Sequence, residues 1–191
     1  MRLAWLLRLL LLGLGLAAIA WAWFWAAVGL VWLGAVGAVA IAGGHAALMA
    51  LEFVWLRALN RGDPAPAPTT VELLRAWAAE VAGAIVVFGW RQPFRSRRFA
   101  DTDRPPAPGR RGVVLVHGFV CNRGLWNGWW PALHAAGVPV VAVDLEPVFG
   151  SIDDYAPRID AAVRRLEQAT GRPPLLVGHS MGGLAIRAWL R

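Results

Sequence analysis

Cysteine and lysine are the residues that this sequence most clearly lacks. Its single cysteine, Cys121, excludes an internal disulfide, and we interpret it as a buried or incidental thiol, not a catalytic one. All 19 basic residues are arginines, and the formal net charge is +7. No nucleic-acid motif accompanies this charge, so we expect contact with anionic lipid and no nucleic-acid partner. No metal-ligand spacing or phosphate-binding loop is present, so neither a metal nor a cofactor is expected.

Charged residues are also absent between Arg8 and Glu52, over a run of 43 residues. A single helix of that length measures roughly 64 Å, about twice the hydrocarbon thickness of a bilayer. Two spans fit better than one, at about 3–21 and 27–51, joined by a tight turn. An aromatic cluster of the kind found at membrane interfaces marks the join: Trp21, Trp23, Phe24 and Trp25. We expect residues 1–57 to form a membrane anchor, a transmembrane helical hairpin whose partner is the lipid bilayer.

Arginines flank the pair of spans on one side, with Arg2 and Arg8 before it and Arg57 and Arg61 after it. The positive-inside rule then predicts a cytoplasmic remainder. We expect the anchor itself to lie in the inner membrane of the cell. Insertion of only one span would place the remainder outside. The first apolar run, ending in Ala18-Ile19-Ala20, also resembles a cleavable signal peptide. The second span follows without a hydrophilic interval, which favours the hairpin.

Two ionisable side chains, His45 and Glu52, lie two helical turns apart in the second span. Ionisable groups inside a membrane are candidates for function. Because Glu52 lies near the expected boundary, we interpret it as a solvated residue at the end of the span. Several glycines suit close contact between the two helices: Gly29, Gly34, Gly37, Gly43 and Gly44.

A connector of residues 58–111 follows the anchor. Residues 60–68 form a proline-rich loop, and a helix is expected over about 70–88. The apolar stretch 81–90 is too short to span a bilayer, so we expect an interfacial helix or one that docks on the domain that follows. Residues 91–112 are interpreted as a basic, proline-containing linker.

Three short apolar runs alternate with helical patterns in the last part of the chain. The runs cover Val113–His117, Pro139–Val143 and Leu175–Val177, and the helical patterns cover about 123–136 and 153–169. Continuous apolar strands separated by helices are typical of a parallel sheet that is covered on both faces. The fold class predicted for residues 112–191 is therefore α/β.

The third strand leads directly into Gly178-His179-Ser180-Met181-Gly182, a G-x-S-x-G pattern between a strand and a helix. In that context the sharp turn exposes the serine hydroxyl at the N-terminus of a helix, where N–H groups favour an adjacent anion. Glycine at 178 and at 182 allows strand and helix to approach closely. The pattern predicts a nucleophilic serine.

The stretch from Val113 to Arg191 resembles the α/β-hydrolase superfamily, and within it the bacterial serine lipase and esterase branch. The resemblance rests on His117-Gly118-Phe119 after the first strand and on the serine motif after the third. It implies a partial α/β-hydrolase domain in which Ser180 attacks an acyl carbonyl. It also implies that the backbone N–H groups of Phe119 and Met181 bind the oxyanion, each contributing about 3–4 kcal/mol.

The sequence departs from that superfamily after the nucleophile, where an acid and then a histidine base are expected. The eleven residues after Ser180 contain neither. No other histidine replaces the base, because His117 belongs to the oxyanion turn, His179 adjoins the nucleophile, His134 is interpreted as a surface residue and His45 as a membrane residue. We therefore expect the 191 residues to be the N-terminal part of a longer hydrolase, truncated after the nucleophile turn and inactive by themselves.

Two segments are candidates for a substrate pocket. Trp126, Trp129 and Trp130 recur at helical spacing, and we interpret them as packing a helix on the sheet instead of lining an acyl pocket. Residues 144–150 follow the second strand and form a better pocket wall, because ligands of open α/β sheets bind at that edge.

Taken with the resemblance, the sequence predicts a membrane-anchored serine hydrolase that cleaves hydrophobic carboxylic esters through an acyl-enzyme at Ser180. An acyltransferase with the same nucleophile and a non-catalytic, membrane-tethered interaction protein are the alternatives.

Overall fold

The computed structural model describes residues 2–102 and 109–191, which divide into two compact units. One unit contains residues 8–89, and the other contains residues 90–191 with the first residues of the chain. Residues 103–108, in the middle of the expected linker, lie outside the described residues.

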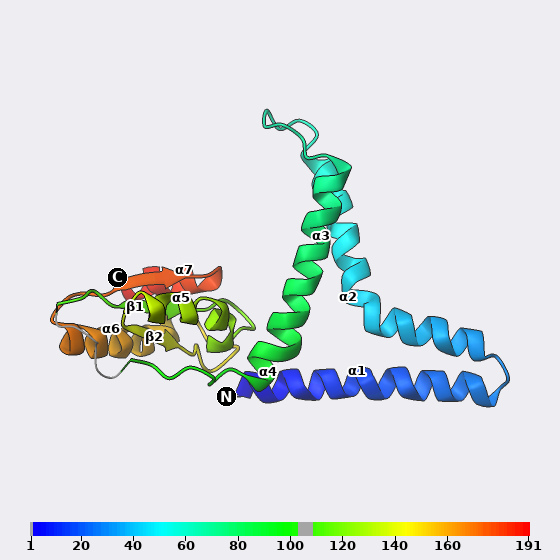
Figure 1. Cartoon of the computed structure of the whole chain (residues 1–191), viewed down its shortest axis with the longest axis horizontal. Helices are drawn as coiled ribbons and strands as arrows, with labels where there is room; N and C mark the ends of the chain where they lie inside the picture. The colour runs from blue at the N-terminus through cyan, green and yellow to red at the C-terminus, as the bar shows by residue number, and fades with distance from the viewer. Residues whose placement is uncertain (1, 103–108) are drawn as a thin grey trace. The chain divides into compact units, whose positions relative to one another are not determined.

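Two long helices, α1 (Arg2–Ala27) and α2 (Val31–Leu59), make up most of the first unit (Figure 1). Their mean hydropathies over the most apolar windows are 2.2 and 1.7, and only 17% and 6% of those windows are buried inside the structure. A core helix of a soluble protein is mostly buried, so the exposure argues against that role. By length and composition both helices are compatible with a membrane anchor or with a signal sequence.

The turn between the two helices differs from the prediction. Helix α1 continues through the aromatic cluster to Ala27, and the chain turns at residues 28–30, where Gly29 has a φ of 81°. Glycine adopts a positive φ without steric cost, whereas residues 22–26 contain no glycine and all fit a helix. The expected join at 22–26 was therefore wrong, and α2 extends beyond the expected end at residue 51 to Leu59.

Two of the glycines allow α1 and α2 to pack closely beside this turn. A Cβ atom on Gly34 would lie 3.0 Å from the Ala22 carbonyl oxygen, and one on Gly37 would collide with the Trp21 indole. The same indole donates a hydrogen bond to the Leu33 carbonyl at 3.1 Å. The expected role in helix contact is thus confirmed for Gly34 and Gly37. A Cβ atom on Gly43 or Gly44 would meet nothing within 4 Å.

Helix α3 (Thr70–Ala84) confirms the helix predicted over about 70–88, and it continues as the π-helical turn η1 (Ile85–Arg91) and the short α4 (Gln92–Phe94). Thr69 and Glu72 form a capping box, in which the Glu72 carboxylate accepts the Thr69 N–H at 2.7 Å. These hydrogen bonds lower the pKa of Glu72. Trp77 joins α3 to α2 by donating from Nε1 to the Ala46 carbonyl at 2.9 Å.

The second unit is built on three parallel strands, β1 (Val113–Val116), β2 (Val140–Val143) and β3 (Leu175–Gly178), in the order β2-β1-β3. Val113 pairs with Val140 on one side and with Leu175 on the other. The three predicted strands and their parallel direction are confirmed. The strand that precedes Ser180, β3, lies beside the strand that precedes Phe119, β1.

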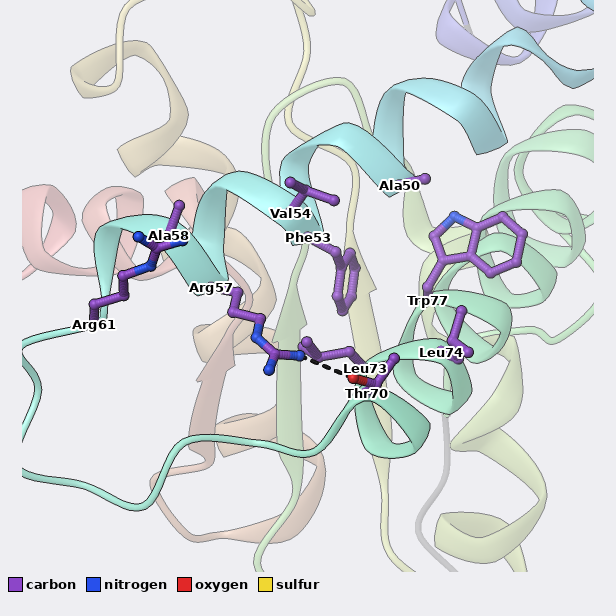
Figure 2. Close-up of a pocket in the computed structure, with 10 residues that line it drawn as sticks. All are labelled: Ala50, Phe53, Val54, Arg57, Ala58, Arg61, Thr70, Leu73, Leu74 and Trp77. Atoms are coloured by element: carbon purple, nitrogen blue, oxygen red, sulfur yellow. Dashed lines mark hydrogen bonds between the residues drawn. The ribbon is translucent and has the colours of Figure 1, made fainter.

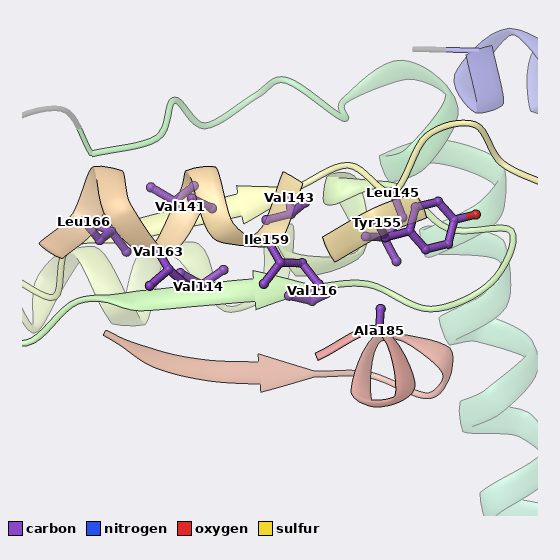
Figure 3. Close-up of a cluster of buried hydrophobic side chains, with 11 residues drawn as sticks. Val114, Val116, Val141, Val143, Leu145, Tyr155, Ile159, Val163, Leu166 and Ala185 are labelled. Carbon is purple, nitrogen blue, oxygen red and sulfur yellow. The ribbon is translucent and has the colours of Figure 1, made fainter. Parts of the chain in front are cut away.

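Helices cover both faces of this sheet, as the continuous apolar strands predict. Helices α6 (Ala156–Thr170) and α7 (Met181–Trp189) cover one face, where they share a core with alternate residues of β1 and β2 (Figure 3). The core of this face includes Val114, Val116, Val141, Val143, Tyr155, Ile159, Leu166 and Ala185. The opposite core contains Leu115, Val140 and Ala142 of the strands with Trp126 and Trp130.

The helix expected over 123–136 is two shorter helices, the 3₁₀-helix η2 (Arg123–Gly128) and α5 (Trp130–Ala135). Asn122 caps η2 by accepting the Gly124 N–H at 2.9 Å, and a proline in the first turn of α5 starts a new helix there. Trp126 and Trp130 are buried against the sheet, which confirms that they pack the helices, whereas Trp129 is exposed.

Residues 101 and 102, within the expected linker, cover the outer edge of β2. Thr102 donates its N–H to the Val140 carbonyl at 2.8 Å and accepts the Val140 N–H on Oγ1 at 3.0 Å. The Asp101 carboxylate accepts the Ala142 N–H at 3.1 Å. Two side chains thus occupy the positions that a neighbouring strand would take.

Three further contacts hold residues 92–101 against η2. The Asp101 carboxylate pairs with Arg123 at 2.7 Å. The buried Gln92 side chain accepts the Asn122 N–H at 2.6 Å, and Asn127 donates to the Arg95 carbonyl at 2.8 Å. This part of the expected linker is an ordered part of the second unit.

Candidate active site

The turn from β3 into α7 holds Ser180 at a φ of 52° and a ψ of −124°. A positive φ is rare for residues other than glycine, and such strain is concentrated at functional sites. Close contacts impose it: a Cβ atom on Gly182 would collide with the Val116 and His117 carbonyl oxygens. A Cβ atom on Gly178 would lie 2.7 Å from the Gly183 nitrogen. The predicted close approach of strand and helix at these glycines is confirmed.

Ser180 lies directly against the turn that follows β1. A Cβ atom on Gly118 would be 3.0 Å from the Ser180 Cβ atom and 3.0 Å from the His179 carbonyl oxygen. The His179 N–H donates to the Val116 carbonyl at 2.9 Å, which joins the two turns at their base. The structure therefore brings together the two motifs that the sequence singled out.

Two backbone N–H groups beside Ser180 are free of hydrogen bonds to the described residues: those of Phe119 and Met181. The next two amides of α7, Gly182 and Gly183, donate to the His179 and Ser180 carbonyl oxygens at 2.9 Å each. A free N–H at the start of a helix is a donor to an anion. The two predicted oxyanion residues thus keep their donors available, one directly after Gly118 and the other directly after Ser180.

The turn that carries Phe119 is itself strained, because Val120 has a φ of 51°. This conformation is unfavourable for a β-branched side chain. The thiol of the next residue, Cys121, is buried. Burial raises the pKa of Cys121, so the thiol is protonated and a poor nucleophile. Its interpretation as a buried thiol is confirmed.

His117 is buried, and both of its ring nitrogens form hydrogen bonds. Nδ1 lies 2.9 Å from the Gly118 carbonyl oxygen, and Nε2 accepts the Leu145 N–H at 3.0 Å. Because an amide only donates, Nε2 carries no proton, and the ring is the neutral tautomer with its proton on Nδ1. Burial lowers the pKa of His117, which also favours the neutral ring. This histidine ties the end of β1 to the end of β2 and is not free to act as a base.

The remaining histidines do not complete a triad in the described part of the chain. His179 is exposed beside Ser180, His134 is exposed on α5 and His45 is exposed on α2. The Ser180 hydroxyl forms no hydrogen bond with any of them or with another described residue. Within residues 2–102 and 109–191 there is also no cluster of three or more histidine, cysteine or acidic side chains that could hold a metal ion.

The segment 144–150, expected as a pocket wall, reaches the turn at Phe119. The exposed Phe149 ring meets the Phe119 ring edge to face, with 5.8 Å between their centroids. Tyr155, the one tyrosine of the chain, fixes this segment by donating to the Pro147 carbonyl at 2.7 Å and accepting the Gly150 N–H at 3.2 Å. Sequence reasoning included Phe149 only as part of the expected pocket wall and missed Tyr155, for which the available signal was that it is the one tyrosine of the chain.

Comparisons with known proteins concern this same part of the chain. Residues 113–190 match a family model described as the alpha/beta hydrolase family. A curated protein of Gibberella zeae, named AB hydrolase superfamily protein, is 32% identical over 81 residues, which cover 40% of this chain. The chain spans 29% of the length of that relative. No solved structure is significantly similar to the chain.

The glycine contacts at the serine turn predict a large effect of one added methyl group. Gly182→Ala is expected to lower the free energy of unfolding of the second unit by about 3 kcal/mol, because the Cβ atom meets two fixed carbonyl oxygens of β1 and the turn after it. Gly183→Ala is the matched control, since its Cβ meets nothing within 4 Å and alanine favours a helix by about 1 kcal/mol. Thermal unfolding of both variants followed by near-ultraviolet circular dichroism measures the difference, and equal midpoints would contradict it.

The buried neutral His117 predicts a loss of stability in acid. Folding lowers its pKa below the ordinary value of 6.5, so the unfolded chain takes up the proton first as the pH falls. The free energy of unfolding should therefore be insensitive to this group above about pH 6.5 and should decrease as the pH falls below it. Thermal midpoints are measured from about pH 8 to about pH 5 for the wild type, His117→Gln and the exposed-residue control His134→Gln. We expect a flatter pH dependence for His117→Gln only, and a wild-type slope in that variant would refute the assignment.

Proposed function

We propose that the protein is a membrane-anchored serine hydrolase of the lipase or esterase type, because residues 113–190 match a model of the alpha/beta hydrolase family. It cleaves hydrophobic carboxylic esters through an acyl-enzyme at Ser180. The observation that carries the proposal is the strained Ser180, which lies against Gly118, while the N–H groups of the residues that follow these two, Met181 and Phe119, donate to no described residue.

The reaction follows from this arrangement. The Ser180 oxygen attacks the ester carbonyl carbon, its proton passes to a base, and the carbonyl oxygen becomes an oxyanion that accepts hydrogen bonds from Met181 and Phe119. The alcohol then leaves with the proton, and the acyl group remains on Ser180. Water attacks the acyl-enzyme in the same way, which releases the carboxylic acid and restores the serine hydroxyl.

The mechanism requires a histidine base with an acidic partner, and His117 does not fill that role because both of its nitrogens are engaged. Its contribution is to position the turn that carries Phe119. Without a base the serine hydroxyl is a weak nucleophile, and the oxyanion donors alone leave about a thousandfold catalysis over water.

A hydrophobic acyl group is the substrate portion that suits the surroundings of Ser180. The exposed rings of Phe119 and Phe149 form an aromatic surface beside the nucleophile. Burying such a surface against an acyl chain is favourable by about 25 cal/mol for each Å² removed from water. The aromatic pair therefore favours lipid or other apolar esters over small polar ones.

Fluorophosphonate labelling tests the nucleophile directly. In protein expressed from its complete gene, we expect Ser180 to be labelled and to hydrolyse p-nitrophenyl esters, and Ser180→Ala to remove the label and reduce turnover by about 1,000-fold or more. Ser151→Ala changes an exposed serine before η3 (Asp153–Tyr155) and should leave both unchanged. The 191 residues alone should label negligibly.

The other outcomes of that experiment separate the alternatives. A labelled protein that transfers acyl groups to an added alcohol faster than to water would be an acyltransferase. A protein from the complete gene that is neither labelled nor active would contradict the enzyme and favour a membrane-tethered interaction protein.

We further propose that α1 and α2 cross the inner membrane and leave the hydrolase unit in the cytoplasm. Arginines near the start of α1 and the end of α2 support this direction: Arg2, Arg8, Arg57 and Arg61. Reporter fusions after Arg61 and after Arg191 should report the cytoplasm, and one inserted at Gly29 should report the outside. An external signal at Arg61 would mean that only one helix crosses and would overturn the topology.

A further inference from the structure

An apolar groove lies between α2 and α3 in the first unit and shares no residue with the site at Ser180. Its volume is about 370 Å³, which is in the range of small-molecule binding sites. Phe53 and Val54 of α2 form one wall, and Leu73, Leu74 and Trp77 of α3 form the other (Figure 2). Such walls offer an occupant apolar contact and almost no hydrogen bonds.

Two cationic side chains stand at one end of this groove, away from Trp77 (Figure 2). Arg57 donates from Nη1 to Thr70 Oγ1 at 3.1 Å, which fixes its guanidinium at the rim. Arg61 lies four residues further along the chain, in the turn after the end of α2. Neither arginine forms an ion pair with a residue in the described ranges. The rim therefore carries two positive charges that the described chain does not neutralise by direct contact.

The next two acidic residues in the sequence, Asp63 of the loop after α2 and Glu72 of α3, form hydrogen bonds with backbone groups and no ion pair with either arginine. The Glu72 carboxylate accepts hydrogen bonds from the Thr69 N–H and hydroxyl, both at 2.7 Å, and Asp63 accepts the Ala65 N–H at 2.8 Å. A second cavity of about 520 Å³ begins at the same two arginines and follows this loop. It provides further space at the arginine end of the groove, where Asn60 is a polar neighbour.

We propose that the groove binds an anionic phospholipid, with one acyl chain between α2 and α3 and the phosphate on Arg57 and Arg61. An acyl chain matches the apolar walls, and a phosphate matches the two arginines at the rim. An anionic phospholipid of the bilayer carries both groups in one molecule. From Ala50 to Ala58 the groove follows α2 for roughly 12 Å, which is long enough for part of an acyl chain. The lipid is a resident ligand, so this site is additional to ester hydrolysis and depends only on the proposed membrane anchoring.

Lipid retention by the purified full chain tests the proposal. The protein in a non-ionic detergent is mixed with equal amounts of phosphatidylglycerol and phosphatidylcholine that carry identical acyl chains, and bound lipids are counted by native mass spectrometry. We expect the wild type to retain phosphatidylglycerol about tenfold better, and Arg57→Gln with Arg61→Gln to reduce that preference to about twofold or less. Arg75→Gln with Arg187→Gln removes the same charge outside the groove and should behave as the wild type.

Two more variants, and inorganic phosphate as a competitor for the arginines, test where the lipid binds. Ala50→Phe places a ring in the apolar end and should lower retention of both lipids about fivefold or more, because it displaces the acyl chain. Ser180→Ala should retain lipid as the wild type does, so failure of the nucleophile and failure of the groove are distinguishable. Excess inorganic phosphate should not release the lipid. Equal retention of the two lipids by the wild type, an equal loss in the charge-matched control, or release by phosphate would overturn the proposal.

Discussion

The second unit depends on one close contact, the approach of α7 to the end of β1 at Gly182. No Cβ atom fits between this residue and the carbonyl oxygens of Val116 and His117. Because strand and helix meet there without a side chain between them, the turn is too short for relaxed backbone angles, and Ser180 takes a positive φ. The same geometry leaves the Met181 amide without a carbonyl partner among the described residues. Strain at the serine and a free donor beside it therefore have a single steric cause.

His117 connects the turn after β1 to the segment that follows the neighbouring strand β2. Its ring lies between the turn after β1 and the segment after β2, and its proton on Nδ1 fixes the direction of both hydrogen bonds. The segment it reaches is also held by Tyr155 and carries Phe149 to the Phe119 ring. A buried neutral imidazole thus bridges the turn that carries Phe119 and the segment that carries Phe149.

Sequence reasoning recovered the parts of the structure that follow from local patterns. Short apolar runs identified all three strands, and the glycines of the serine motif identified the sharp turn. Features that depend on distant partners were missed. Asp101 and Thr102 form their hydrogen bonds with the edge of β2, which is distant in the sequence. The sequence around these two residues, taken alone, therefore resembles a polar linker. The helix turn at Gly29 was misplaced because the aromatic residues before it suit both a helix and a membrane interface. The site roles of Ser180, Phe119 and Met181 stay predictions.

The two outer edges of the sheet are not equivalent. The backbone of β2 faces Asp101 and Thr102, whose side chains already occupy its hydrogen-bonding positions, whereas no described strand pairs with the outer side of β3, and Leu175 there is about half exposed. The sheet can therefore grow in one direction only. Any strand added to it must lie next to β3, the strand that leads into Ser180. Because the β2 edge is already occupied, residues on an added strand can enter the sheet only on the β3 side.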